Sequence, residues 1–156
     1  LGVAWAFDIQ QDALTASRQL LSECGNLEKV RLIHDSHVNV AKYIEGNIDV
    51  AVYNLGYRPG SDHSVTTTAQ STLESLEVVC SKLNSGGIIV IVAYTGHSTG
   101  VDEKKALDAH LISLPQKEFT VACWKMINQI NNPPVLYVIE RKQRGEMCES
   151  SAARKD

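Results

Sequence analysis

The sequence predicts an α/β protein with an open, mostly parallel β-sheet that ends in an antiparallel pair of strands. Two patterns lead to this prediction. From residue 3 to residue 114, short apolar segments alternate with segments of helical periodicity, which is typical of parallel strands joined by crossover helices. The last two apolar segments, 120–127 and 135–140, have no helix between them, so we expect them to pair antiparallel across a short loop.

The first half of the pattern starts with an apolar strand, 3–7, which ends at Asp8. A helix is predicted over 12–24, because Ala and Leu residues recur there at roughly helical spacing and Gly25 follows as a terminator. Residues 30–33 form the second predicted strand.

The second half contains longer elements. Residues 48–53 form a third strand, and 67–83 carries its Leu and Val residues on one face of a predicted helix that stops near Ser85-Gly86-Gly87. Residues 88–93 are almost all Ile and Val, which predicts a central parallel strand covered on both faces. A helix over 101–114 follows.

Composition predicts one compact domain, 1–141, followed by a polar and disordered tail, 142–156. No apolar run approaches the roughly 18 residues of a membrane span, and the first residues do not resemble a signal peptide. We therefore expect a soluble, intracellular protein, cytoplasmic or organellar. The net charge of −3 argues against a protein that coats polyanions, and four dispersed cysteines are predicted to be reduced thiols.

Polar residues follow the first two predicted strands, where open α/β sheets bind ligands. Asp8, with Gln10 beside it, is placed to accept hydrogen bonds from a ribose diol; the alternative is an N-cap for the next helix. His34-Asp35-Ser36-His37 is interpreted as a loop that contacts a nucleotide, or as a solvated loop. Metal binding and a hydrolase triad are both less favoured, because adjacent loop residues diverge and no nucleophile elbow is present.

The third strand runs into Asn54-Leu55-Gly56-Tyr57, with Pro59-Gly60 just beyond. Such a loop offers an amide, backbone carbonyls and an aromatic face, which are groups that can hold an amine. The glycines would let the backbone approach a ligand closely. A plain turn that ends the strand is the alternative.

Several ordered motifs between Val3 and Arg141 resemble one family. They are Asp8-Ile9-Gln10, Ser36-His37, Asn54-Leu55-Gly56-Tyr57-x-Pro-Gly, Thr66-Thr67-Thr68, Gly86-Gly87, Tyr94-x-Gly-His97 with Gly100 and Glu103, and Asn128-Gln129-x-Asn131-x-Pro133-Pro134. The sequence thereby resembles the YtqB/MnmM-type class I S-adenosylmethionine-dependent methyltransferases, long labelled rRNA methylases. Its Asn-x-x-Tyr arrangement is also similar to the Asn-Pro-Pro-Tyr motif of amino-directed nucleic-acid methyltransferases.

The resemblance implies a Rossmann-like class I methyltransferase sheet and S-adenosyl-L-methionine as the cofactor. Members of the family methylate the amine of 5-aminomethyl-2-thiouridine at the tRNA wobble position. The implied partner is tRNA at its anticodon region, with no DNA, membrane or metal, and a homodimer is compatible with the sequence. The alternatives are a methyltransferase for rRNA or a small amine, and a non-catalytic, methyltransferase-like binding protein.

The resemblance also implies roles for individual residues. Asp8 and Gln10 would contact the adenosyl ribose, and Ser36 and His37 would line the adenosine side of the cofactor pocket. The catalytic pair would be Asn54 and Tyr57, with Asn54, Leu55 and Gly56 also against the cofactor. Candidates for the substrate side are Tyr57, Arg58, Tyr94, His97, Asn128 and Asn131.

Some of these residues also have plain structural interpretations. His97 is equally compatible with a turn or a helix cap, and Asn128 and Asn131 with turn chemistry. No general base is assigned, because methyl transfer from a sulfonium mainly requires alignment of the nucleophile and the methyl group.

The glycine-rich first motif of the family would precede Asp8 by about twenty residues, and residues 1–156 do not contain it. The resemblance therefore predicts a sheet that lacks its first strand and helix. The strands 3–7 and 48–53 would then be separated by a gap or pair directly. Weak cofactor binding by this chain is the expected consequence.

Overall fold

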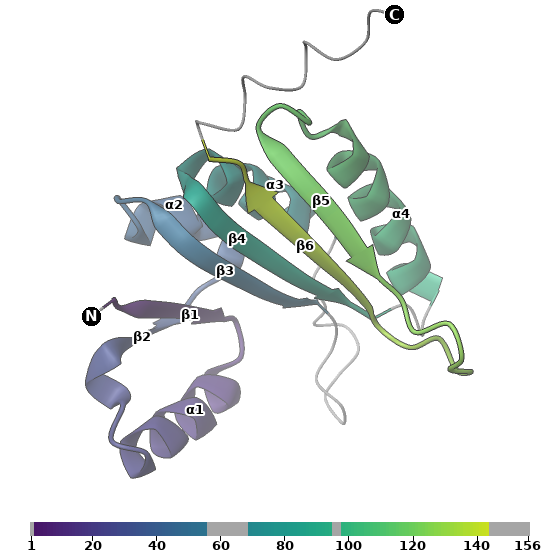
Figure 1. Cartoon of the computed structure of the whole chain (residues 1–156). Helices are drawn as coiled ribbons and strands as arrows, with labels where there is room; N and C mark the ends of the chain where they lie inside the picture. The colour runs from purple at the N-terminus through teal and green to yellow at the C-terminus, as the bar shows by residue number, and fades with distance from the viewer. Residues whose placement is uncertain (1, 56–68, 95–97, 144–156) are drawn as a thin grey trace, which may run out of the picture. The chain divides into compact units, whose positions relative to one another are not determined.

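The structure, a computed structural model, describes residues 2–55, 69–94 and 98–143, with only the backbone for 98–103 (Figure 1). The chain divides into two compact units, residues 1–44 and 45–156, which are considered separately below. The elements alternate between strand and helix until the final strand pair, as the sequence predicts.

The first unit is a parallel strand pair with a helix between the strands. Strand β1 pairs with β2 in parallel, from Ala4 opposite Val30 to Asp8 opposite His34, so the carboxyl ends of the two strands lie side by side. The elements are β1 (Ala4–Asp8), α1 (Gln11–Glu23), η1 (Leu27–Lys29), β2 (Val30–His34), η2 (His37–Asn39) and α2 (Val40–Tyr43). Gly25, at φ 66°, ends the first helix in the left-handed conformation that glycine adopts readily.

The second unit is a four-stranded sheet in the order β3-β4-β6-β5. Strands β3 and β4 are parallel, whereas β6 is antiparallel to both β4 and β5, which confirms the predicted C-terminal antiparallel pair. The elements are β3 (Ile48–Leu55), α3 (Ala69–Lys82), β4 (Leu83–Ala93), α4 (Ser98–Ser113), β5 (Phe119–Trp124) and β6 (Val135–Arg141). Strands β1 and β3 belong to different sheets.

One cross-strand row anchors both long helices to this sheet. Tyr53, Ile91 and Tyr137 lie directly opposite one another on β3, β4 and β6, and all three are buried. The Tyr53 hydroxyl hydrogen-bonds the Ser75 hydroxyl of α3 at 2.9 Å, and the Tyr137 hydroxyl donates to Asp108 of α4 at 2.6 Å. Helices α3 and α4 therefore cover the same face of the sheet, as Figure 1 shows.

The other face of the sheet is more open. On β4, Ile89 and Ile91 are fully buried, while Ile88, which precedes Ile89 and points to the opposite face, is 37% exposed. On β3, Val50 and Val52 are also exposed. The uninterrupted Ile and Val run predicted burial on both faces, but both helices of this unit pack on one face only.

Several predicted element ends differ in the structure: the strand predicted over 120–127 is β5, Phe119–Trp124, and the helix predicted over 101–114 is α4, Ser98–Ser113. Two further differences have a clear cause. Strand β3 continues through Asn54 and Leu55, because these residues pair with Val92 and Ala93 of β4. Helix α3 stops at Lys82, where the Arg141 guanidinium donates to the carbonyl oxygens of Cys80, Ser81 and Leu83. These bonds satisfy helix-end carbonyls that have no partner within the helix.

The C-terminal end of the described chain remains attached to the sheet. The Lys142 backbone N–H donates to the Glu118 carbonyl at 2.8 Å, and its ammonium donates to the Gln116 carbonyl at 2.7 Å. Most of the predicted tail, 144–156, lies outside the described residues.

Gly86 and Gly87, predicted to precede strand β4, instead lie inside it at an irregularity. Ile48 pairs with Leu83 and Val50 with Ile88, so extra β4 residues bulge out between two pairs. Gly86 has φ 77°, and a Cβ on Gly87 would lie 2.8 Å from the Asn84 carbonyl oxygen. The bulge therefore requires glycine at position 87 for space.

We expect Gly87→Ala to lower the free energy of unfolding by about 1–3 kcal/mol, because the new methyl group meets backbone oxygens that cannot rotate away. Gly46→Ala is the matched control, since a Cβ there would meet no described atom within 4 Å. Urea unfolding of both variants measures the difference. Equal stability of the two would contradict this account of the bulge.

Candidate functional site

Several predicted site residues leave the four-stranded sheet at the same end. Leu55 and Ala93 are paired at the carboxyl ends of β3 and β4, and Ala93 also pairs with Val135, the first residue of β6. Tyr94 follows directly after Ala93, and the loop 125–134 joins β5 to β6 at this edge. This edge is where open α/β sheets place their ligands.

A pocket opens at this edge, on the helix-covered face of the sheet. Its described walls come from the ends of two strands and from two helices: Leu55, Ala69, Thr72, Leu73, Ala93, Tyr94, Lys104 and Leu107. Leu55 and Ala93 lie one row beyond the buried Tyr53 and Ile91, so that row forms the support beneath the pocket. Most of the lining is apolar, with a hydroxyl on Thr72, a phenol on Tyr94 and an ammonium group on Lys104.

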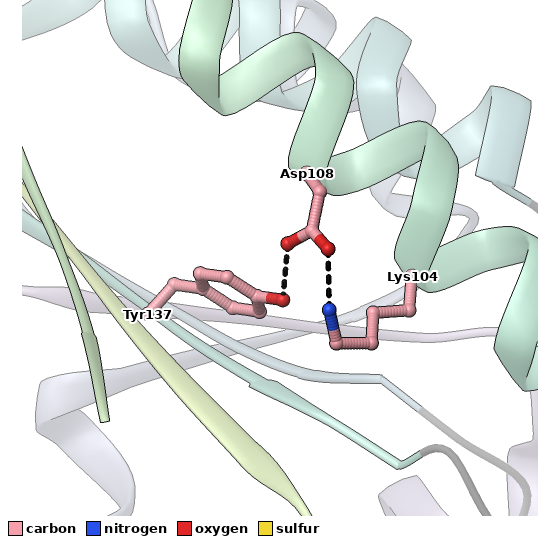
Figure 2. Close-up of polar contacts among 3 residues, drawn as sticks. All are labelled: Lys104, Asp108 and Tyr137. Carbon is pink, nitrogen blue, oxygen red and sulfur yellow. Dashed lines mark hydrogen bonds and ion pairs between the residues drawn. The ribbon is translucent and has the colours of Figure 1, made fainter. Parts of the chain in front are cut away.

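A polar cluster holds Lys104 at the wall of this pocket (Figure 2). Lys104 and Asp108 form an ion pair one helical turn apart on α4, and Asp108 accepts a second hydrogen bond from Tyr137 on β6. The Lys104 ammonium also lies 5.9 Å from the centre of the Tyr137 ring, within cation–π range. The cluster ties the pocket wall to the middle of the sheet.

The same contacts set the charges of the cluster. The hydrogen bond with Asp108 raises the pKa of Lys104, so this side chain is a cation at neutral pH. Burial raises the pKa of Asp108, but the hydrogen bonds from Lys104 and Tyr137 outweigh it and lower the pKa overall. Burial, together with the Asp108 contact, raises the pKa of Tyr137 to about 12, so Tyr137 stays a neutral donor.

Asn54 and Leu55 lie on opposite faces of β3. Leu55 is buried and lines the pocket, as described, whereas Asn54 is exposed on the face that also carries Val50 and Val52. Successive side chains of an unbroken strand point to opposite faces of the sheet, so neighbours such as these two are separated by the strand. The Asn54 amide is therefore open at the strand end on the side away from the helices.

Four predicted site residues lie outside the described part of the chain. Gly56, Tyr57 and Arg58 fall within 56–68, and His97 falls within 95–97. In sequence, both stretches join residues of the pocket wall, since the first connects Leu55 to Ala69 and the second follows Tyr94.

The loop 125–134 carries Asn128 and Asn131, and both side chains are exposed. Asn131 has φ 73° and the next residue, Asn132, has φ 49°, so these two positions also serve the turn that precedes β6. Ile127 in the same loop is 97% exposed, which sequence periodicity gave no reason to expect.

In the first unit, Asp8 ends β1 and is half-buried. One carboxylate oxygen, Oδ1, accepts from the backbone N–H of Gln10 at 2.8 Å, while Oδ2 has no partner among the described residues. The N-cap of α1 is Gln10, and its side chain makes no capping bond, so Asp8 does not serve as the N-cap. A free carboxylate oxygen at a strand end suits a ribose hydroxyl.

The loop after β2 lies beside Asp8, since Asp8 is paired with His34. The imidazole Nε2 of His34 is 3.0 Å from the Ile9 carbonyl oxygen, which links the two loops. Ser36 caps the following 3₁₀ turn through its hydroxyl, and His37 is the first residue of that turn. The two predicted adenosine-side residues therefore follow directly on a strand end adjacent to that of β1.

Asp35 organises this loop, a role that the sequence did not indicate. Its carboxylate accepts hydrogen bonds from the Asn39 amide at 2.8 Å and the Tyr43 hydroxyl at 2.9 Å. These bonds lower the pKa of Asp35, so it stays ionised. The sequence did contain a signal for these hydrogen bonds, because Asn39 and Tyr43 follow Asp35 at four-residue intervals.

Lys104 and Asp108 were also missed. Their i, i+4 spacing on a predicted helix is the usual signal of an ion pair, but it did not distinguish a pocket wall from a solvated face. Tyr137, the third member, is 29 residues from Asp108 and could be placed only with the strand register known.

Two negative findings apply to the part of the chain that the structure describes. It holds no group of three or more His, Cys, Asp or Glu side chains able to bind a metal ion. It also has no helix that is both long and apolar enough to cross a membrane.

Comparison with known proteins identifies related chains. A family model described as "Putative rRNA methylase" matches residues 4–140. A chloroplastic tRNA (mnm(5)s(2)U34)-methyltransferase of Arabidopsis thaliana is 30% identical over 146 residues, covering 90% of this chain and 53% of the relative. The chain thus spans about half the length of that protein.

Solved structures agree with this result. A "putative rRNA-methylase" from Clostridium thermocellum is 38% identical with a TM-score of 0.87, covering 90% of this chain and 75% of the other. A "putative methyltransferase" from Streptococcus mutans, in complex with SAH, is 37% identical with a TM-score of 0.83, covering 89% and 76%. The Rossmann-like methyltransferase sheet predicted from the sequence is thereby confirmed.

We expect Asp108→Asn to lower the free energy of unfolding at pH 7 by about 1 kcal/mol. The ion pair with Lys104 is lost, but solvent screens a carboxylate whose side chain is 37% exposed. Because folding lowers the pKa of Asp108, its contribution is present above pH about 4 and lost as the pH falls further. The wild-type and variant stabilities should therefore converge in acid.

Urea unfolding between pH 3 and pH 7 measures this difference. Glu118→Gln, which removes one exposed carboxylate, is the control for net charge. An equal effect of both substitutions at every pH would contradict a specific role for Asp108.

Proposed function

The chain belongs to the family described as "Putative rRNA methylase", and we propose that the protein is an S-adenosylmethionine-dependent N-methyltransferase that modifies tRNA. Its substrate in this proposal is the aminomethyl group of 5-aminomethyl-2-thiouridine at the wobble position, in the anticodon region. The observation that carries the proposal is the 30% identity to a relative named as a tRNA (mnm(5)s(2)U34)-methyltransferase, along nearly the whole of this chain.

The residues of the first unit fit the adenosyl part of the cofactor. Asp8 presents a carboxylate oxygen, Oδ2, that no described residue uses, and a ribose hydroxyl would donate to it. Ser36 and His37 follow the adjacent strand end and would lie along the adenosine. The relative from Streptococcus mutans in complex with SAH supports S-adenosylmethionine as the methyl donor.

The second unit would hold the amine. Asn54 has its amide at the carboxyl end of β3, exposed on the face opposite the helices. An amide oxygen there would accept an N–H bond from the aminomethyl group and direct the nitrogen lone pair toward the methyl group. Tyr57 is three residues further along and would add an aromatic wall that stabilises developing positive charge.

Bound S-adenosylmethionine supplies an electrophilic methyl group on a sulfonium. With this donor bound, the unprotonated amine would form an N–C bond as the donor's S–C bond breaks, and the product ammonium would release its proton to solvent. The chain contributes alignment, which can account for much of the barrier reduction in a two-substrate reaction. Tyr94, Asn128 and Asn131, at the same sheet edge, would position the RNA.

We expect the chain to transfer labelled methyl groups from S-adenosylmethionine to tRNA that contains the aminomethyl group, and not to tRNA that lacks it. Asn54→Ala should lower the rate by about 100-fold, in the range of losing one positioned hydrogen-bonding group. Scintillation counting of precipitated tRNA at a high cofactor concentration measures both. Val52→Ala, on the same face of the same strand, is the control.

Equal transfer by wild type and Asn54→Ala would contradict the role of Asn54. Transfer to tRNA without the aminomethyl group would favour another RNA nucleophile. Binding of tRNA with no transfer at all would favour the non-catalytic binding protein.

Asp8→Asn should weaken cofactor binding, because the oxygen that stays bonded to Gln10 leaves an NH₂ group in the place of Oδ2, and that group cannot accept a hydrogen bond from a ribose hydroxyl. The expected increase in Kd is about tenfold, the loss of one hydrogen bond to a charged group. Calorimetric titration of S-adenosylhomocysteine measures it. Asp12→Asn, in the first turn of α1, is the control, and equal affinities of the two variants would contradict the ribose assignment.

A further inference from the structure

We propose that Asp35 is a positioning residue of the cofactor site, which fixes the turn at Ser36 so that the Ser36 hydroxyl can donate a hydrogen bond to the adenosine. Tyr43 assists by joining this turn to strand β1. The inference rests on the proposed function, since it assumes that the first unit binds the adenosyl part of the cofactor. It assigns a role to two residues that act on the ligand through a third.

Asp35 uses its carboxylate within the protein. Its Oδ1 accepts from the backbone N–H of Ser36 at 2.7 Å and from the Asn39 amide at 2.8 Å, and its Oδ2 accepts from the Tyr43 hydroxyl at 2.9 Å. An ionised carboxylate offers about four acceptor positions, so these bonds leave Asp35 little capacity for a ligand. Asp8, by contrast, has one bond among the described residues, which leaves its Oδ2 open. The two carboxylates therefore have different roles, since Asp8 is placed to contact a ribose and Asp35 to hold the loop.

Ser36 is held by three hydrogen bonds. Its backbone N–H donates to Asp35, its carbonyl oxygen accepts from the Asn39 backbone N–H at 2.9 Å, and its Oγ accepts from the Val38 N–H at 3.4 Å. The hydroxyl proton is the one Ser36 donor that has no partner in the described part of the chain. A hydroxyl can donate one hydrogen bond while it accepts another. This proton can therefore serve an acceptor on the ligand, such as a ring nitrogen of adenine or a ribose oxygen.

Tyr43 connects this turn to the neighbouring strand. Its ring packs edge-to-face on Phe7 of β1, with the ring centres 5.6 Å apart and an interplanar angle of 68°. Phe7 directly precedes Asp8 in the strand. Because the Tyr43 hydroxyl donates to Asp35, one side chain ties the loop that carries Ser36 to the strand that carries Asp8.

The charges of the network suit these bonds at neutral pH. The hydrogen bonds from the Asn39 and Tyr43 side chains and from the Ser36 backbone lower the pKa of Asp35, so its carboxylate stays ionised. The hydrogen bond to Asp35 raises the pKa of Tyr43, so the phenol keeps the proton that it donates. Donors and acceptors are thus in place without a ligand, and such preorganisation lowers the cost of ordering a binding site.

A double-mutant cycle tests whether Asp35 acts through Ser36. The Kd of S-adenosylhomocysteine is measured by calorimetric titration of the full chain carrying Ser36→Ala, Asp35→Ala or both. Each single substitution should raise Kd about tenfold, the loss of one hydrogen bond to the ligand. The double variant should also bind about tenfold more weakly than wild type, because the second substitution removes only what the first has already lost.

Asn26→Ala is the matched control. It removes two hydrogen bonds of the first unit near the amino end of β2, whereas Ser36 follows the carboxyl end. Asn26 accepts from the Lys29 ammonium at 2.8 Å and donates to the Cys24 carbonyl at 3.2 Å. This variant should bind like wild type even where urea unfolding shows a loss of stability comparable to that of Asp35→Ala.

Tyr43→Phe provides a milder variant of the same network. It keeps the ring against Phe7 and removes one of the three hydrogen bonds to Asp35, so Kd should rise about threefold. It replaces Asp35→Ala in the cycle with Ser36→Ala if Asp35→Ala does not fold.

A double variant that binds about 100-fold more weakly than wild type would mean that Asp35 and Ser36 act independently, and would overturn the inference. Unchanged affinity of Asp35→Ala, or an equal loss of affinity in Asn26→Ala, would also overturn it. These results would leave the proposed function intact. No binding of S-adenosylhomocysteine by the wild-type chain would instead contradict the cofactor site itself, and would overturn the inference with it.

Discussion

The buried row Tyr53–Ile91–Tyr137 is the constraint on which the candidate site of the second unit depends. Its two hydroxyl groups bond Ser75 of α3 and Asp108 of α4, so each helix is held at a fixed height on the sheet. Each bond contributes only about 1 kcal/mol net, but a buried hydroxyl without its partner would cost more than that. Burial raises the pKa of Tyr53 to about 12, so the phenol remains a neutral hydrogen-bonding group at physiological pH. The next row, Leu55 and Ala93, then forms one wall of the pocket.

The two faces of the carboxyl end of β3 have different roles in this account. Leu55 faces the helices and the Lys104 pocket, whereas Asn54 faces the open side, where the amine is proposed to react. In the first unit, the paired ends of β1 and β2 present Asp8 and the Ser36-His37 turn in the same way, with Asp35 holding the turn. In both units, hydrogen bonds between elements fix groups that lie near one another only because parallel strands share an edge.

Much of the fold could be predicted from the sequence, because the pattern of apolar residues within each element indicates its type. The Ile and Val run predicted β4, and the absence of a helical segment between β5 and β6 predicted their antiparallel pairing. Features that depend on a partner strand could not be predicted in this way. The end of β3 depends on pairing with Val92 and Ala93, and Gly86 and Gly87 sit in a bulge although they resemble a helix terminator. The strand-end positions of Asp8 and Tyr94 followed from the strand pattern. The contact between Asp108 and Tyr137 required the register of β6, so the Lys104 pocket was not predicted.

The central claim is that the protein completes the methylated wobble nucleoside of tRNA. Mass spectrometry of nucleosides, from tRNA of cells that lack the gene, tests it most directly because the native protein and its natural substrate are compared. The account predicts that 5-aminomethyl-2-thiouridine accumulates, that 5-methylaminomethyl-2-thiouridine disappears, and that the wild-type gene restores it while an Asn54→Ala gene does not. An unchanged nucleoside profile in the deletion strain would contradict the account.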